Sequence, residues 1–163
     1  MILQPARLFS PQRSSSQIAI RKHMPDVRML CDSAIELADE GRFDEAILVM
    51  NSVIRTDSNN PNIWYNKGLI HYKQGKFTDA VNSFSQAADI DPGFIDALYN
   101  KGLALMKIEK YTQAIRAFDA VIKQDPKNRQ ARIAWKQANE ALLMSLTTVS
   151  PASDIQTRLV KEK

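Results

Sequence analysis

Residues 64–92 carry the decisive pattern, WYNKGLIHYKQGKFTDAVNSFSQAADIDP, in which two amphipathic segments are separated by a glycine and ended by Asp-Pro. Apolar residues recur every three or four positions on both sides of Gly75, as they do in helices that bury one face. Glycine favours the left-handed backbone that ends a helix, and Pro92 prevents a helix from continuing. Two helices of about 13 residues are marginal in isolation, so this hairpin needs neighbours.

The same pattern occurs three times, with 34 residues between Trp64 and its counterpart Leu98. The other copies read LYNKGLALMKIEKYTQAIRAFDAVIKQDP at residues 98–126 and LCDSAIELADEGRFDEAILVMNSVIRTDS at residues 30–58. The shared positions hold a glycine, an aromatic, an alanine, a large apolar residue and an aspartate: Gly41 and Gly75; Phe43, Phe77 and Tyr111; Ala46, Ala80 and Ala114; Met50, Phe84 and Phe118; Asp57, Asp91 and Asp125. A spacing this regular, without insertions, predicts a stack of helical hairpins.

Each copy is expected to form two helices, at about residues 62–74 and 78–90 in the second copy. The side chains of Asp44, Thr78 and Thr112 are expected to cap the second helices, because their oxygens can accept from free backbone N–H groups. We place the repeats at 27–60, 61–94 and 95–128, inside a folded domain that covers residues 26–146.

The segment RQARIAWKQANEALLMSL at residues 129–146 predicts one closing helix after the third repeat. The side chains expected to pack on that repeat are Ala131, Trp135, Ala138 and Leu142. The side chains expected to face outwards are Ile133, Ala134, Ala141, Leu143 and Leu146. An outward apolar face of this kind either lengthens the contact with the last repeat or mediates self-association.

The net charge of +4 lies in the terminal segments, because residues 1–25 carry four basic and no acidic side chains and residues 145–163 carry +1. The remaining −1 leaves the domain without the basic surface that a nucleic-acid partner requires, so we expect none. Residues 1–25 are expected to be a disordered basic leader, although a mitochondrial transit peptide or an upstream extension before Met24 also fits. Residues 147–163 are expected to be a mobile tail.

No apolar run is long enough to span a bilayer, and the single cysteine, Cys31, excludes an intrachain disulfide. These features fit a cytoplasmic protein, or an organellar one if the leader is a transit peptide.

These repeats resemble the tetratricopeptide repeat (TPR), a unit of 34 residues. The matching residues are Trp64, Gly68, Phe77, Ala80, Phe84, Ala87 and Pro92. The sequence departs from the family at Lys67 and Lys101, where leucine is usual, and at Ser58, which replaces the closing proline of the first copy. The resemblance implies an all-α fold, a right-handed superhelix (α-solenoid) of antiparallel helix pairs. It also implies a scaffold that binds a protein or peptide partner in a concave groove lined by the first helix of each pair.

Ten residues of the second and third copies form the predicted peptide-binding groove: Tyr65, Asn66, Leu69, Tyr72, Lys73, Tyr99, Asn100, Leu103, Met106 and Lys107. The tyrosines would anchor the ligand with large apolar surfaces, and the asparagines would bond to an extended peptide backbone. The lysines would favour a mildly acidic ligand. The identities between the two copies are also explained by a recent duplication.

A subset of the family holds the acidic C-termini of heat-shock chaperones in a clamp of lysine, asparagine and arginine side chains. Among the five clamp positions only Asn66 carries the family's residue, because Cys31, Ile35, Asp96 and Asn100 occupy the others. The resemblance therefore implies a ligand other than a chaperone C-terminus.

Nothing in the sequence indicates an enzyme. It has no phosphate loop, no metal-ligand spacing and no nucleophile elbow. His71 stands where the other copies have Leu37 and Leu105, so we expect it to pack between helices. We expect neither catalysis nor a cofactor or metal. Two alternatives to an adaptor remain: a self-associating module that uses the closing helix, and association with a membrane or nucleic acid through the basic leader.

Overall fold

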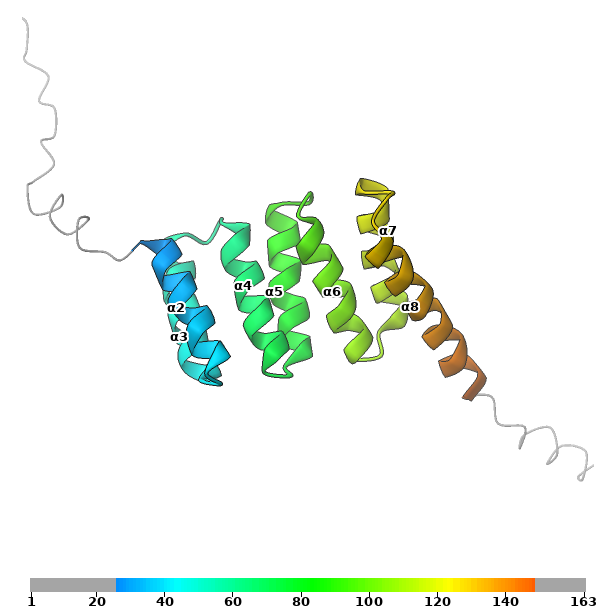
Figure 1. Cartoon of the computed structure of the whole chain (residues 1–163), viewed down its shortest axis with the longest axis horizontal. Helices are drawn as coiled ribbons and strands as arrows, with labels where there is room; N and C mark the ends of the chain where they lie inside the picture. Colours follow the sequence, from blue (N-terminus) through cyan, green and yellow to red (C-terminus); the bar gives the residue numbers. More distant parts are fainter. Residues whose placement is uncertain (1–25, 149–163) are drawn as a thin grey trace, which may run out of the picture.

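The computed structural model describes residues 26–148, which form three helical hairpins and one closing helix (Figure 1). The helices are α2 (Val27–Asp39), α3 (Phe43–Thr56), α4 (Pro61–Lys73), α5 (Phe77–Ile90), α6 (Ile95–Lys107), α7 (Tyr111–Gln124) and α8 (Arg129–Thr148). Every regular element in this range is a helix, which confirms the predicted all-α solenoid and its seven helices. The predicted leader at 1–25 and the part of the predicted tail after residue 148 lie outside the described residues.

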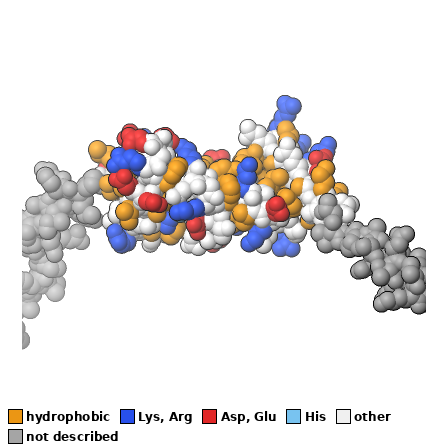
Figure 2. Space-filling model, turned by 90° about the horizontal axis from the view of Figure 1, so that it is seen from below, with side chains coloured by type: hydrophobic (Ala, Val, Ile, Leu, Met, Phe, Trp, Pro, Cys, Tyr) orange, Lys and Arg blue, Asp and Glu red, His pale blue; other side chains and the backbone are white. Residues whose placement is uncertain are grey.

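The hairpins stand side by side in one row, in chain order (Figure 1). Each hairpin packs on the next one, through α3 on α4 and α5 on α6, and the third hairpin packs on the closing helix through α7. Within this range no helix is both long enough and apolar enough to cross a bilayer. On the face seen in Figure 2, acidic and basic side chains are interspersed and form no continuous basic stripe.

The two helices of each hairpin are joined by a tight turn that requires a left-handed residue. Gly41 and Gly75 supply it with φ of 81° and 78°, and Glu109 stands at the same place in the third hairpin with φ of 60°. The N–H of the following residue then bonds back across the turn, as Lys76 does to the carbonyl of His71 at 2.9 Å. A side chain in this conformation costs about 1–2 kcal/mol, so the third turn carries strain that the first two avoid.

The prediction that Asp44, Thr78 and Thr112 cap the second helices is wrong. The helices begin two residues earlier than the predicted caps require, and none of the three helices has a side-chain cap. The reason is the short turn: Lys76 both closes α4 through its N–H and accepts the first bond of α5, from Ala80 at 3.0 Å. Lys76 is therefore itself the N-cap residue of α5, and its side chain cannot accept a hydrogen bond from the free N–H groups of the first turn.

A glycine of the first helix faces a buried phenylalanine of the second helix in two hairpins. A Cβ added to Gly68 would lie 2.5 Å from Cε1 of Phe84, and one added to Gly102 would lie 2.5 Å from Cε1 of Phe118. Both rings are fully buried. In the first hairpin, Ala34 replaces the glycine and Met50 replaces the phenylalanine. The extra methyl group of Ala34 on the first helix is therefore accompanied by a flexible, unbranched side chain on the second helix.

The closing helix α8 packs through small residues, and the predicted burial is wrong at two positions. Ala134 was expected to face outwards but is only 3% exposed, whereas Trp135 was expected to be packed and is 36% exposed. The buried row is Ala131, Ala134 and Ala138. Alanines at this spacing let α8 approach α7 closely, which leaves the large indole at the side of the contact. Ile133, Leu143 and Leu146 are exposed, as expected.

We predict that Gly68→Ala lowers the free energy of unfolding by about 1–2 kcal/mol. Overpacking against the Phe84 ring should outweigh the helix propensity that alanine gains, which is worth about 1 kcal/mol. Adding Phe84→Met reproduces the Ala34–Met50 pair and should recover part of the loss, as measured by chemical denaturation. Strictly additive effects of the two substitutions would show that the contact does not set the helix spacing.

Candidate functional site

The predicted groove residues lie on one face of α4 and α6, which we call the first-helix face and define by Tyr65, Leu69, Tyr72, Tyr99, Leu103 and Met106. These side chains are half-buried and rest on the core clusters beneath them. Their spacing places them on one side of each helix, since positions three and four apart are neighbours. The first-helix face therefore presents apolar surface that is only partly covered by the protein's own core.

Tyr65 is held in place by Phe84 of its own hairpin and by Phe94 and Asn100 of the next one. Its ring centroid lies 4.9 Å from that of Phe94 and 5.7 Å from that of Phe84. Its hydroxyl accepts a hydrogen bond from Nδ2 of Asn100 at 3.1 Å. Burial raises the pKa of the Tyr65 hydroxyl, and the charge of Asp96 adds to this. The phenol is therefore neutral and oriented before any ligand arrives.

The Asn100 side chain is also committed within the protein. Its Nδ2 donates to Tyr65 and to the backbone carbonyl of Asp96, at 3.1 and 2.9 Å. Its Oδ1 accepts no hydrogen bond from the described residues. Asn100 can therefore offer a ligand an acceptor rather than a donor.

Phe94 was missed in the sequence although it supports Tyr65. The matching positions hold Asn60 and Asn128, whose side chains accept from the backbone N–H groups of Asn62 and Ala131 at helix starts. Phe94 makes no such cap at the start of α6. The replacement of asparagine by phenylalanine at this repeat position was the signal in the sequence that Phe94 has a different role.

Tyr99 has the same place in its repeat as Tyr65 but different surroundings. Its ring packs on Phe118, with centroids 5.7 Å apart. The position that corresponds to Asn100 is Ala134 of α8, which offers no side-chain donor. Within residues 26–148 the Tyr99 hydroxyl forms no hydrogen bond, so it is free for a ligand.

The two predicted lysines also differ. Lys73 forms an ion pair with Asp39 of α2, so part of its charge is already neutralised. Lys107 occupies the same place on α6 and has no ion-pair partner among the described residues. A carboxylate on a ligand would therefore meet a free cation at Lys107 and a shared one at Lys73.

A cavity of about 200 Å³ opens between α2 and α4 on this side of the molecule. Ile35 and Ala38 line it from α2, and Leu69, Tyr72 and Lys73 line it from α4. The Tyr72 ring is held edge-on by Phe77, with centroids 5.2 Å apart. Three predicted groove residues thus meet at one apolar hollow that a ligand side chain could fill.

A second hollow, of about 470 Å³, lies at the N-terminal ends of α2 and α4 and contains Asn66. Cys31 lines it but is only 7% exposed. Burial raises the pKa of the Cys31 thiol, although the neighbouring Asn66 side chain partly opposes this. The thiol is therefore protonated near neutral pH and is a poor nucleophile.

His71 is buried, and its Nδ1 has no hydrogen-bond partner in the described structure. Burial lowers its pKa from the ordinary value of 6.5; the charge of Asp79 opposes this, and those of Lys67 and Lys76 add to it. The described residues contain no group of three or more histidine, cysteine, aspartate or glutamate side chains that could hold a metal ion.

Comparison with known proteins agrees with this geometry. A family model described as "Anaphase-promoting complex, cyclosome, subunit 3" matches residues 39–121, just over half of the 163 residues. The chain belongs to this tetratricopeptide repeat family. No curated protein sequence matches the chain significantly.

Solved TPR domains share the fold at low sequence identity. The first TPR domain of Spaghetti (RPAP3), bound to the HSP90 peptide SRMEEVD, has a TM-score of 0.66 and 21% identity and covers 72% of this chain and 93% of its own. The second TPR domain of human RPAP3, in complex with the HSP70 peptide SGPTIEEVD, has a TM-score of 0.63 and 23% identity. The match covers 70% of this chain and 98% of the RPAP3 domain. The Sgt2 TPR domain from Aspergillus fumigatus has a TM-score of 0.69 and 16% identity, and the match covers 78% of this chain and 86% of the Sgt2 domain. Identities this low support the fold alone.

We predict that acidification destabilises this TPR domain through His71. The folded state lowers the pKa of His71, so below about pH 6.5 the unfolded chain binds the extra proton and stability falls. His71→Leu and His71→Gln both remove the titrating group, and the loss of melting temperature between pH 7.5 and 5.5 should be smaller in both. His71→Leu should also raise the melting temperature at neutral pH, because it removes an unpaired buried nitrogen. An unchanged pH dependence in both variants would assign the acid sensitivity to other groups.

Proposed function

We propose that this TPR domain is an adaptor that binds an extended peptide segment along the first-helix face. The observation that carries the proposal is the combination of a half-exposed apolar row on α4 and α6 with the hollow beside Leu69 and Tyr72. Peptides bound to the related RPAP3 domains support the same class of ligand.

The dimensions suit a short segment. Neighbouring helices pack about 10 Å apart, so a face of three hairpins and a closing helix spans on the order of 30 Å. An extended chain advances by about 3.4 Å per residue, which corresponds to roughly eight or nine residues. The ligand would cross the first helices and place alternate side chains against them.

We infer a division of roles along this face. The hollow between α2 and α4 would take an apolar side chain, and Tyr99 would contribute both its ring and its free hydroxyl. Asn100 would accept from a backbone N–H of the ligand, and Lys107 would pair with an acidic side chain. Tyr65 would act chiefly as a fixed wall, since its hydroxyl is already bonded to Asn100.

The residues at the clamp positions favour a ligand other than a chaperone C-terminus. The protonated thiol of Cys31 and the apolar Ile35 cannot pair with a carboxylate. Asp96 is exposed and would repel one. The only family residue at these positions is Asn66.

A self-associating module is a second candidate, favoured by the exposed apolar side chains of α8. Ile133, Leu143 and Leu146 are 49%, 63% and 62% exposed. Light scattering over a range of protein concentrations tests this alternative. Self-association requires that the molar mass of the wild type rises with concentration and that the molar mass of Leu143→Lys does not.

We predict that Tyr99→Ala weakens binding of nine-residue peptides, selected on the wild-type protein from a random phage library, by at least about tenfold. Aromatic residues near the centre of an interface commonly contribute 2 kcal/mol or more. Tyr99→Phe keeps the ring and should lose only the contribution of the hydroxyl. Arg55→Asn changes an exposed residue of α3, away from this face, and is the control that should bind normally. Selected peptides that bind Tyr99→Ala as well as they bind the wild type would place the site elsewhere.

We also predict that the HSP90 peptide SRMEEVD binds this domain at least about tenfold more weakly than it binds the RPAP3 domain, as measured side by side by calorimetry. Asp96→Lys should strengthen the binding, because it replaces the repulsive carboxylate by a cation at a clamp position. Tight binding of SRMEEVD by the wild type would contradict the proposed ligand class while leaving peptide binding itself intact.

A further inference from the structure

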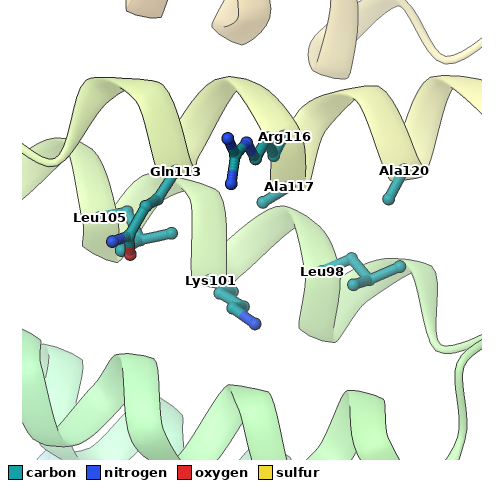
Figure 3. A pocket seen from close by; sticks show the side chains of 7 residues that line it. All are labelled: Leu98, Lys101, Leu105, Gln113, Arg116, Ala117 and Ala120. Carbon is teal, nitrogen blue, oxygen red and sulfur yellow. The ribbon is translucent and has the colours of Figure 1, made fainter.

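A cleft of about 350 Å³ lies between α6 and α7, away from the first-helix face (Figure 3). Leu98, Leu105 and Ala117 form its apolar floor, and Lys101, Gln113 and Arg116 form its polar rim. A helix turns by about 100° per residue, so Leu98, Lys101 and Leu105 share a stripe roughly opposite to that of Tyr99, Leu103 and Met106. The cleft is therefore distinct from the proposed groove.

In the second repeat, the lysine at the position of Lys101 has partners for its ammonium group. Lys67 corresponds to Lys101, and its Nζ donates to Oδ1 of Asn51 at 2.8 Å. The same Nζ lies 5.4 Å from the ring centroid of Trp64, close enough for a cation–π interaction. Burial lowers the pKa of the Lys67 amine, and the negative charge of Asp79 partly opposes this.

Each of these neighbours is replaced in the third repeat. Ser85 stands in place of Asn51, Leu98 in place of Trp64, and Gln113 in place of Asp79. The smaller Leu98 leaves open the space that an indole would occupy. Lys101 therefore lies beside the cleft without hydrogen-bond, ion-pair or cation–π partners among residues 26–148.

A second positive charge is added at the same place. Arg116 replaces Asn82 of the second repeat, and its guanidinium and the amine of Lys101 rim the same cleft. No carboxylate lines the cleft, and Asp119, one turn further along α7, forms no ion pair with Arg116 within the described residues. The replacements from the second to the third repeat thus make this site both more open and more positive.

We propose that the cleft is a second docking site, which binds a peptide segment carrying an aliphatic side chain next to an acidic one. The aliphatic side chain lies on Leu98, Leu105 and Ala117. The carboxylate accepts from Lys101 and from Arg116, whose planar guanidinium can donate two parallel hydrogen bonds. Charge complementarity selects an anionic ligand, and the apolar floor selects against a simple inorganic anion.

The size and shape favour part of a larger partner over a free small molecule. A volume of about 350 Å³ is near the lower end of the roughly 300–1,000 Å³ found for small-molecule sites. The cleft is an open trough between two helices, so a free small molecule would remain largely in contact with water. One or two side chains of a peptide fit it, while the rest of the peptide contacts the rim.

The test is an NMR titration of the full chain with the acetylated, amidated peptide Ser-Leu-Glu-Leu-Glu-Ser and with its neutral counterpart, in which glutamine replaces glutamate. We expect the acidic peptide to shift amide signals around residues 98–105 and 113–120 at millimolar concentration. The neutral peptide should bind at least tenfold more weakly. The double variant Gln113→Asp and Arg116→Asn restores exposed residues of the second repeat and should reduce binding at least tenfold. The matched control Arg55→Asn removes one exposed charge on α3, outside both proposed sites, and should bind as the wild type does.

Leu98→Trp is a second variant, which fills the trough as Trp64 does and should also abolish binding. Its fold is checked by the helical circular dichroism signal. Absence of any shift with the acidic peptide, equal binding of the neutral peptide, or shifts centred on Tyr99 would each overturn the proposal. Saturable binding of dodecanoate without binding of the peptide would assign the cleft to a small amphiphile instead. Shifts centred on Tyr99 would instead assign the acidic peptide to the first-helix face, which the selected peptides and Tyr99→Ala test separately.

Discussion

The contact between a glycine on the first helix of a hairpin and a buried phenylalanine on the second sets the distance between the two helices. At Gly68 the backbone approaches the Phe84 ring so closely that even a methyl group would overlap it. Because the ring is fully buried in this contact, that side of α4 is closed to ligands. The opposite side remains half-exposed, and it can form a binding surface because its helix is fixed from behind.

The 34-residue spacing predicts the fold well, because it identifies which residues meet within each hairpin. The structure adds that the glycine of the first helix faces the phenylalanine of the second. Local details were harder to predict. The capping role of Thr78 depended on where α5 begins, and the shared turn residue Lys76 decides that. The burial of Trp135 depended on how closely α8 approaches α7, which the alanines of α8 determine.

The sequence predicted which residues share the face of the candidate site, but not which neighbours surround each of them. Tyr65 and Tyr99 occupy equivalent places, so a periodic pattern assigns them the same role. Their neighbours come from the next hairpin along the chain, where Phe94 and Asn100 meet Tyr65 but Asn128 and Ala134 follow Tyr99. A repeat pattern therefore predicts which side chains share a face, whereas departures from the pattern decide which of them are free to bind.

These departures accumulate in the third repeat. In the second repeat Tyr65 is bonded to Asn100, Lys73 is paired with Asp39, and Lys67 is bonded to Asn51. The corresponding groups of the third repeat are the Tyr99 hydroxyl, Lys107 and Lys101, and none of them has such a partner within residues 26–148. Tyr99 and Lys101 are partly buried, whereas Lys107 is exposed. Polar groups held partly buried without partners reduce stability, and an external ligand that supplies the missing partner recovers that loss on binding. The second repeat is therefore built chiefly for structure, and the third presents unsatisfied groups on two opposite sides of α6. This asymmetry explains why repeats with nearly the same fold need not contribute equally to recognition.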